Sequence, residues 1–307
     1  MTKRKSPKRA ANELTALLRT VLGEDRFPVD VEQLAIEVSN QQEDPITKIK
    51  RVDIDGFDGM LRAHRNKPGW HILYNGQTDY PGRERFTLAH EFGHYMLHRR
   101  PLKPEFYSTG KLPDGFDFEC LPLQSNQWKD FEKEPEEEAD TFASYLLMPI
   151  DDYRIQVSGE EMTLGLLKHV TSRYGVSLLA VARKWIEFTD KKAAMIVARD
   201  DFALWGRASD AAFKDGVFIR PGMPIPNNAI AALGPEANLH DNGNPTSVPA
   251  GVWKFSRGSE SVRDLTVFSE RLGMSVTILQ FDDDTAGADI GEERSWDSYD
   301  QFRHNSR

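Results

Sequence analysis

Two histidines and a glutamate occur in the pattern His90-Glu91-x-x-His94, where x is any residue. On a helix, positions i and i+4 lie on the same face, so the two imidazoles can bind one metal ion together. Glu91 stands beside the first histidine, within reach of a water molecule at that ion, where a carboxylate can act as a general base. This arrangement is typical of zinc-dependent peptidases. The alternative is a solvated helix whose histidines bind nothing.

The residues around this motif predict the helix that it needs. Apolar side chains and the two histidines recur at helical spacing from Phe86 to Leu97, so the histidines share a face that turns inward. His98 lies one turn beyond His94 on that face. A histidine that only packs in the core or lies at the surface is the alternative role for His98.

A zinc ion held by two histidines needs a third protein ligand, and a catalytic site keeps its fourth position open. Residues 136–147 predict a second helix, on which Glu136 and Asp140 stand at i and i+4 on an otherwise apolar face. One of these carboxylates can bind the metal while the other holds a ligand histidine by its second nitrogen. A solvated acidic run is the alternative, and it describes Glu134 and Glu137 better than Glu136.

Two long stretches, from Arg85 to His98 and from Glu136 to Pro149, resemble the ImmA/IrrE-type zinc metallopeptidases. Weaker similarity extends the match to roughly residues 12–190. The family includes proteases that cut helix-turn-helix repressors in stress responses and mobile elements. The resemblance therefore implies such a repressor as the protein substrate. Two departures stand out: the segment between the two stretches is longer than usual, and no clear DNA-binding module precedes the catalytic part.

The resemblance also implies a set of site residues. One zinc ion per chain is bound by His90, His94 and Glu136, with Glu91 as the catalytic base. Asp140 is left to orient a ligand histidine.

The tetrahedral oxyanion formed during peptide hydrolysis needs a further hydrogen-bond donor. Tyr95, His98 and Tyr145 are candidates for this contact or for a contact to substrate, and the sequence does not rank them.

Composition narrows the class of protein. The 307 residues are 39% hydrophobic and 28% charged, as in a soluble globular protein, and the net charge of -9 argues against a general nucleic-acid binder. Direct binding of nucleic acid through a local basic surface stays open. Cys120 is the only cysteine, so no intramolecular disulfide forms, and its acidic and apolar neighbours do not favour a thiolate nucleophile.

The sequence contains no signal-peptide pattern and no run of about 20 apolar residues, so we expect a cytoplasmic protein without a membrane anchor. Residues 1–11 are a basic segment that we expect to be disordered. Helices are predicted at residues 12–22, ending at Gly23, and directly after Asp30, which is a candidate N-cap.

The expected fold class is α+β. A zinc peptidase-like catalytic domain at residues 12–158 combines the active-site helix with a small antiparallel sheet of two or three strands at residues 46–75. Turns are expected at Asp55-Gly56 and Asp58-Gly59. Such a sheet can hold an extended peptide by β-addition. Residues 99–135 lack periodicity and read as an aromatic-rich flap over the site, or as a disordered insertion.

The remaining chain is expected to form three further parts. Residues 159–189 are a helical region that could resemble a helix-turn-helix, and residues 190–281 are a second, smaller α+β domain with strands near 194–197 and 275–279. Layout alone suggests a sensor or regulatory role for this domain. The acidic residues 282–307 read as a disordered tail.

Two other functions compete with peptidase activity. One is a DNA-binding regulator that uses the paired helices at residues 163–188, where Arg173, Arg183 and Lys184 lie. The other is a stress sensor whose metallopeptidase-like domain is non-catalytic and whose zinc is structural.

Overall fold

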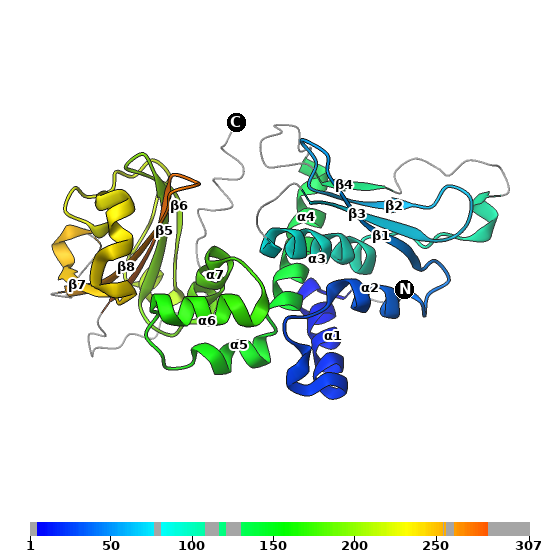
Figure 1. Ribbon diagram of the computed structural model, residues 1–307, viewed down its shortest axis with the longest axis horizontal. Coiled ribbons are helices and arrows are strands. Elements are labelled where there is room, and N and C mark those ends of the chain that lie inside the picture. The colour runs from blue at the N-terminus through cyan, green and yellow to red at the C-terminus, as the bar shows by residue number, and fades with distance from the viewer. Residues whose placement is uncertain are drawn as a thin grey trace. The chain divides into compact units, whose positions relative to one another are not determined.

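The computed structural model describes residues 5–76, 81–107, 117–120, 130–253, 255 and 261–281. The chain forms two compact units, one of Met1–Tyr153 with Ser172–Ser177 and the other of Arg154–Thr171 with Leu178–Arg307. Both units combine helices with a sheet, so the fold is mixed α+β (Figure 1). The main segment of the first unit ends at Tyr153, whereas we expected the catalytic domain to extend to residue 158. The unit also includes Ser172–Ser177, which we expected to belong to the helical region at residues 159–189.

The helices of the first unit begin and end where local chemistry favours it. Ser6 caps α1 with its side chain, and Pro7 occupies the first turn, so the helix begins within the segment that was expected to be disordered. Gly23 ends α1 with a φ of 58°, and Asp30 caps α2 by accepting a hydrogen bond from the Gln33 amide, both as predicted. The bounds of the helical segments are α1 Pro7–Leu22, η1 Gly23–Arg26, α2 Val31–Ser39, α3 Pro81–Leu97, η2 Pro104–Tyr107 and α4 Asp130–Leu147.

The sheet of the first unit is mixed, which corrects the expected antiparallel sheet. Its strand order is β1-β3-β2-β4, with β1 parallel to β3 and the other neighbours antiparallel. Local turn signals show where the chain reverses but not which strand it then pairs with, and β3 returns to pair between β1 and β2. The bounds are β1 Ile46–Val52, β2 Gly59–Ala63, β3 Trp70–Asn75 and β4 Phe118–Cys120.

The edge strand β4 comes from the segment that was expected to be a flap. Its residues pair with the start of β2, and Asp117 accepts a hydrogen bond from the Ala63 amide at 2.9 Å. The rest of that segment is described only at residues 99–107 and from 130 onward. Helix α4 begins at Asp130, six residues before the predicted start, with Pro135 inside the helix. It ends at Leu147, before Met148-Pro149, as predicted.

Helix α3 lies along one face of this sheet, beneath β2 and β3 (Figure 1). Leu61, Trp70 and Ile72 of the sheet and Phe92 of the helix are fully buried between the layers. Helix α4 packs against α3, and α1 packs against α4. The His90-Glu91-x-x-His94 motif thus lies on a helix that packs against the sheet and against α4.

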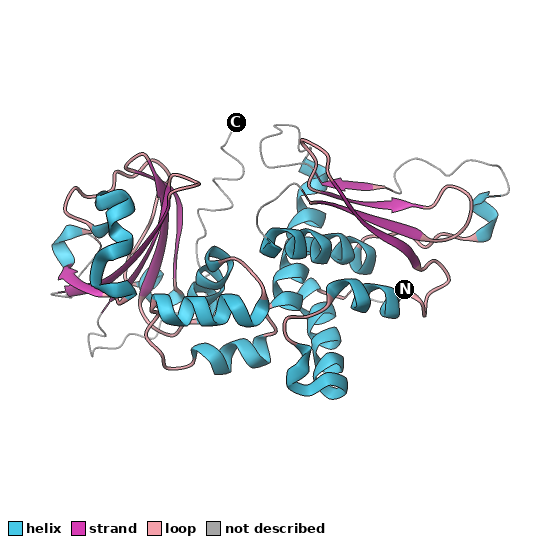
Figure 2. Cartoon of the chain, viewed as in Figure 1, coloured by secondary structure: helices cyan, strands magenta, loops and turns pink. Residues whose placement is uncertain are grey.

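The second unit is built on an antiparallel sheet in the order β6-β5-β9-β8-β7. The two strands predicted from sequence, near 194–197 and 275–279, lie in β5 and β9 and pair with each other. Figure 2 shows the sheet between α7 and the helical turns of η3. Residues of β5 are buried on both faces, as a central strand requires. The strand bounds are β5 Ala193–Arg199, β6 Phe202–Ala208, β7 Thr246–Pro249, β8 Ser261–Ser269 and β9 Met274–Phe281.

Short helices complete the described chain. Helix α5 was not predicted, and the helices expected from residue 163 and from residue 177 appear as α6 and α7. Their bounds are α5 Ile150–Val157, α6 Leu164–Tyr174, α7 Leu178–Phe188, α8 Asp210–Lys214, η3 Ile230–Gly243 and η4 Ala250–Val252. The acidic tail at residues 282–307 lies outside the described residues. Among the helices that are described, none is long and apolar enough to cross a bilayer.

Candidate metal centre

Three side chains from two helices converge in the first unit. The Nε2 atoms of His90 and His94 on α3 lie 3.0 Å apart. The Glu136 carboxylate on α4 places one oxygen 3.1 Å from His90 Nε2 and the other 3.2 Å from His94 Nε2. Within the described residues these three form a group that could hold a metal ion.

The spacing of these atoms fits a small cation. Two ligand atoms bound to one tetrahedral zinc ion at about 2.05 Å lie about 3.3 Å from each other. The observed separations of 3.0, 3.1 and 3.2 Å come close to that value. Two imidazoles with one carboxylate are also a donor set that zinc accepts in catalytic sites. The residues present therefore fit the ion.

Burial and hydrogen bonding together set the protonation states of His94 and Glu136. Burial lowers the pKa of His94 to about 4, so its imidazole is neutral near pH 7. Burial alone would raise the pKa of Glu136, but its hydrogen bonds to His90 and His94 outweigh that effect and hold the pKa below its ordinary value. Neutral imidazoles beside an ionised carboxylate are the forms that bind metal.

A glycine allows the two helices to approach closely enough for this convergence. A Cβ atom on Gly93 would come within 3.2 Å of Ala139 Cα and 3.1 Å of a Phe142 ring carbon. Ala139 and Phe142 are fully buried at the same contact. A side chain at position 93 would therefore press on α4, which carries Glu136, and the neighbouring atoms would have to shift by a few tenths of an ångström.

The second nitrogens of the two histidines also have partners. His90 Nδ1 lies 2.8 Å from an oxygen of Asp140, which stands one turn after Glu136. His94 Nδ1 lies 2.9 Å from His98 Nδ1, and His98 Nε2 lies 2.9 Å from a carboxylate oxygen of Glu138. With Nδ1 engaged on both rings, the Nε2 atoms are left to face the centre.

Glu91 is fully buried beside the two histidines on α3. The start of β2 passes directly over it: a Cβ atom on Gly59 would lie 2.5 Å from Glu91 Oε1 and 2.7 Å from Thr87 Cγ2. Sequence reasoning placed Gly59 in a turn and missed this contact. A glycine where a strand begins does signal close approach of another group, and that was the available clue.

Of the three candidates for an oxyanion contact, His98 contacts His94, with the two Nδ1 atoms 2.9 Å apart. The Tyr95 hydroxyl donates to the Asp44 carbonyl at 3.2 Å, and its ring is covered by the Arg99 guanidinium. Burial raises the pKa of Tyr95 to about 12. Tyr145 stands nine residues after Glu136 on α4, about 13.5 Å along the helix axis, and its ring faces Lys8 of α1.

One aromatic side chain was not foreseen at the centre. The Phe118 ring on β4 stacks on the His94 imidazole, with ring centroids 4.9 Å apart and an interplanar angle of 19°. It thereby covers one face of the His94 ring. The sequence had shown Phe118 only as one of several aromatic residues scattered through the expected flap.

The part of the chain that contains these side chains matches a known protein family. The Peptidase_M78 family model, described as an IrrE N-terminal-like domain, matches residues 43–185. This confirms the ImmA/IrrE resemblance for that part of the chain, which contains all of the converging side chains. A search of curated proteins found no match.

Among solved structures, the chain is similar to a Mycobacterium tuberculosis transcriptional regulator. The TM-score is 0.42 at 10% sequence identity, and the alignment covers 90% of this chain and 82% of that chain.

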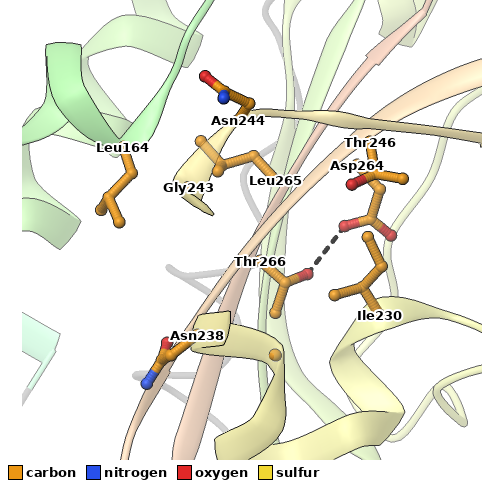
Figure 3. A pocket seen from close by; sticks show the side chains of 10 residues that line it. Leu164, Ile230, Asn238, Gly243, Asn244, Thr246, Asp264, Leu265 and Thr266 are labelled. Atoms are coloured by element: carbon orange, nitrogen blue, oxygen red, sulfur yellow. Dashed lines mark hydrogen bonds between the residues drawn. The ribbon is translucent and has the colours of Figure 1, made fainter. Parts of the chain in front are cut away.

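The second unit contains a pocket lined by residues of α6, η3, β7 and β8, shown in Figure 3. Its volume is about 10 Å³, which holds about one water molecule. Asp264 in its wall accepts hydrogen bonds from Trp253 Nε1 at 3.0 Å and from the Thr266 hydroxyl at 2.8 Å. This carboxylate serves the packing of the domain, and the pocket is too small for an organic ligand.

Proposed function

We propose that this chain is a zinc-dependent endopeptidase that cuts a protein substrate. The observation that carries the proposal is the convergence of two imidazole Nε2 atoms and a buried carboxylate beside a second buried glutamate, Glu91. The match to a peptidase family supports it. His90, His94 and Glu136 hold the ion, one per chain, and Asp140 orients the His90 ring through its Nδ1 proton.

A zinc ion held by His90, His94 and Glu136 would supply a Lewis acid for the scissile carbonyl and would lower the pKa of water toward about 7. Glu91 takes the proton of the attacking water at a carboxylate oxygen and returns it to the amine of the departing peptide. The buried position of Glu91 beneath Gly59 limits the directions in which that carboxylate can turn. A fixed base saves the entropy of orienting it at each turnover.

We propose a helix-turn-helix repressor as the substrate class, in a stress-response or mobile-element system. Support comes from the family resemblance of the two motif stretches. The first unit also presents a sheet beside the metal centre, as a peptidase that binds an extended substrate strand would need.

The competing function, DNA binding through the helices at residues 163–188, has less support from the contacts of its basic residues. Arg173 is paired with Asp152 at 2.7 Å and with Glu24 at 2.7 Å, and Lys184 is 2% exposed. Phosphate binding needs clustered cations that face solvent. Of the three basic residues that suggested this function, Arg173 is therefore engaged in ion pairs and Lys184 is buried.

The proposal is tested by incubating the zinc-loaded protein with each helix-turn-helix repressor encoded near its gene. Intact-mass analysis is expected to show one repressor cut at a defined bond. Treatment with EDTA should stop the cleavage, and added zinc should restore it. Cleavage that persists in the metal-free protein would overturn the proposal. If none of the repressors is cut but another protein is, the proposed substrate class is wrong.

A further inference from the structure

Two side chains continue the metal centre beyond its ligands. His98 stands four residues after His94, just past the end of α3, and its side chain is 4% exposed. Glu138 reaches His98 from α4, with a carboxylate oxygen 2.9 Å from His98 Nε2. On the other side of the ring, His98 Nδ1 lies 2.9 Å from His94 Nδ1. The three groups form an unbroken chain of hydrogen bonds from a ligand histidine to a carboxylate.

A cation at the centre allows one arrangement of protons along this chain. The His94 Nε2 atom must offer its lone pair to the ion, so the His94 proton lies on Nδ1. His94 Nδ1–H then donates to His98 Nδ1, which must be an acceptor. The His98 proton consequently lies on Nε2, where it donates to the Glu138 carboxylate. Each of the two 2.9 Å contacts then has one donor and one acceptor.

The reverse arrangement is incompatible with metal. If His98 Nδ1 carried the proton, His94 Nδ1 would have to accept it, and the His94 proton would move to Nε2. That proton would point at His90 Nε2 and Glu136, into the space that the cation needs. In a neutral His98, which carries one ring proton, Glu138 excludes this arrangement: its carboxylate oxygen accepts a hydrogen bond from Nε2–H, so Nδ1 stays an acceptor.

We propose that His98 and Glu138 are a positioning pair that fixes the tautomer and the ring orientation of His94. They do for His94, through a relay, what Asp140 does for His90 by direct contact. The inference rests on the metal site of the proposed function. It also gives His98 a role other than the oxyanion contact expected from sequence, since both of its nitrogens are engaged along the relay.

The test measures zinc affinity, which does not require peptidase activity. Zinc dissociation constants are determined by competition with a chromophoric chelator for the wild type, His98→Phe and Glu138→Gln. Each variant is expected to bind zinc about 10- to 100-fold more weakly, the usual effect of removing a partner of a ligand histidine. Glu134→Gln, which alters an exposed glutamate of the same helix, is the matched control and should bind as the wild type does.

Two further measurements separate positioning from a general structural role. The double variant His98→Phe/Glu138→Gln should bind zinc no more weakly than His98→Phe, because the two residues act in series on one ring. His98→Gln should recover part of the affinity, because its amide oxygen can accept the His94 Nδ1 proton. Far-UV circular dichroism of the metal-free variants identifies any that fail to fold, and His98→Gln and Glu138→Gln then carry the test.

Wild-type zinc affinity in His98→Phe and Glu138→Gln, or losses that add in the double variant, would overturn the inference. The outcome is separable from that of the proposed function. A protein whose zinc affinity depends on the pair but which cuts nothing would keep this inference and lose peptidase activity. A protein that cuts its substrate while the variants bind zinc normally would do the opposite.

Discussion

Replacing Gly59 by alanine should damage catalysis without touching a metal ligand. The added Cβ atom would lie 2.5 Å from Glu91 Oε1 and 2.7 Å from Thr87 Cγ2, where ordinary contacts are above 3.4 Å. Glu91 or the β2 backbone must therefore move by about 1 Å, and a displacement of that size at a reacting group costs about 100-fold in rate. In free energy of activation this is about 2.7 kcal/mol.

The assay is the rate of cleavage of the repressor that the wild type cuts, with zinc affinity measured in parallel. Gly59→Ala should lose about two orders of magnitude in kcat/KM while binding zinc as the wild type does. Gly251→Ala is the matched control, because a Cβ atom there meets nothing within 4 Å. A Gly59→Ala protein that cuts at the wild-type rate would refute both the position of Glu91 and its role as the base.

Three other predictions follow from the same contacts. Glu136→Ala should lose zinc almost entirely, since a buried carboxylate ligand is removed; zinc bound with wild-type affinity in equilibrium dialysis would contradict the ligand set. Phe118→Ala should speed the transfer of zinc to EDTA in a stopped-flow experiment, because the ring that covers His94 is gone, and an unchanged rate would count against that cover. Asp152→Ala should lower the free energy of unfolding by about 3 kcal/mol, because the Arg173 guanidinium loses its buried partner. Burial alone would raise the pKa of Asp152, but the hydrogen bonds from Arg173 and Tyr174 outweigh it and lower the pKa. The contribution of Asp152 to stability is therefore fully present above about pH 3.9, the value in an unfolded chain, and is lost as the pH falls through the lowered pKa. Urea unfolding of Asp152→Ala should accordingly depend less on pH in that range than unfolding of the wild type.

The grouping of His90, His94 and Glu136 could be predicted because these residues lie on two helices whose periodicity is visible locally. His90 and His94 are one turn apart, and so are Glu136 and Asp140, and helical phase alone places each pair on one face. The caps at Gly23 and Asp30 are equally local, since each depends on the backbone of its own turn. In each of these cases the interacting residues lie within a few positions of each other in the sequence.

What escaped prediction depends on contacts between distant segments. Gly59 lies over Glu91 because β2 crosses α3, and a glycine at the start of a strand signals a close approach without showing which group approaches. Glu138 stands off the face shared by Glu136 and Asp140, so helical phase set it aside, and its partner His98 lies 40 residues away in the sequence. The parallel pairing of β1 with β3 likewise depends on where a later strand returns.

The most direct test of the central claim compares the wild type with Glu91→Gln, each loaded with zinc and each shown by metal analysis to contain one ion per chain. The amide keeps the size of the carboxylate and cannot accept the proton of the attacking water. The account predicts that Glu91→Gln retains its zinc and fails to cut a substrate that the wild type cuts. Cleavage by Glu91→Gln at the wild-type rate would contradict it.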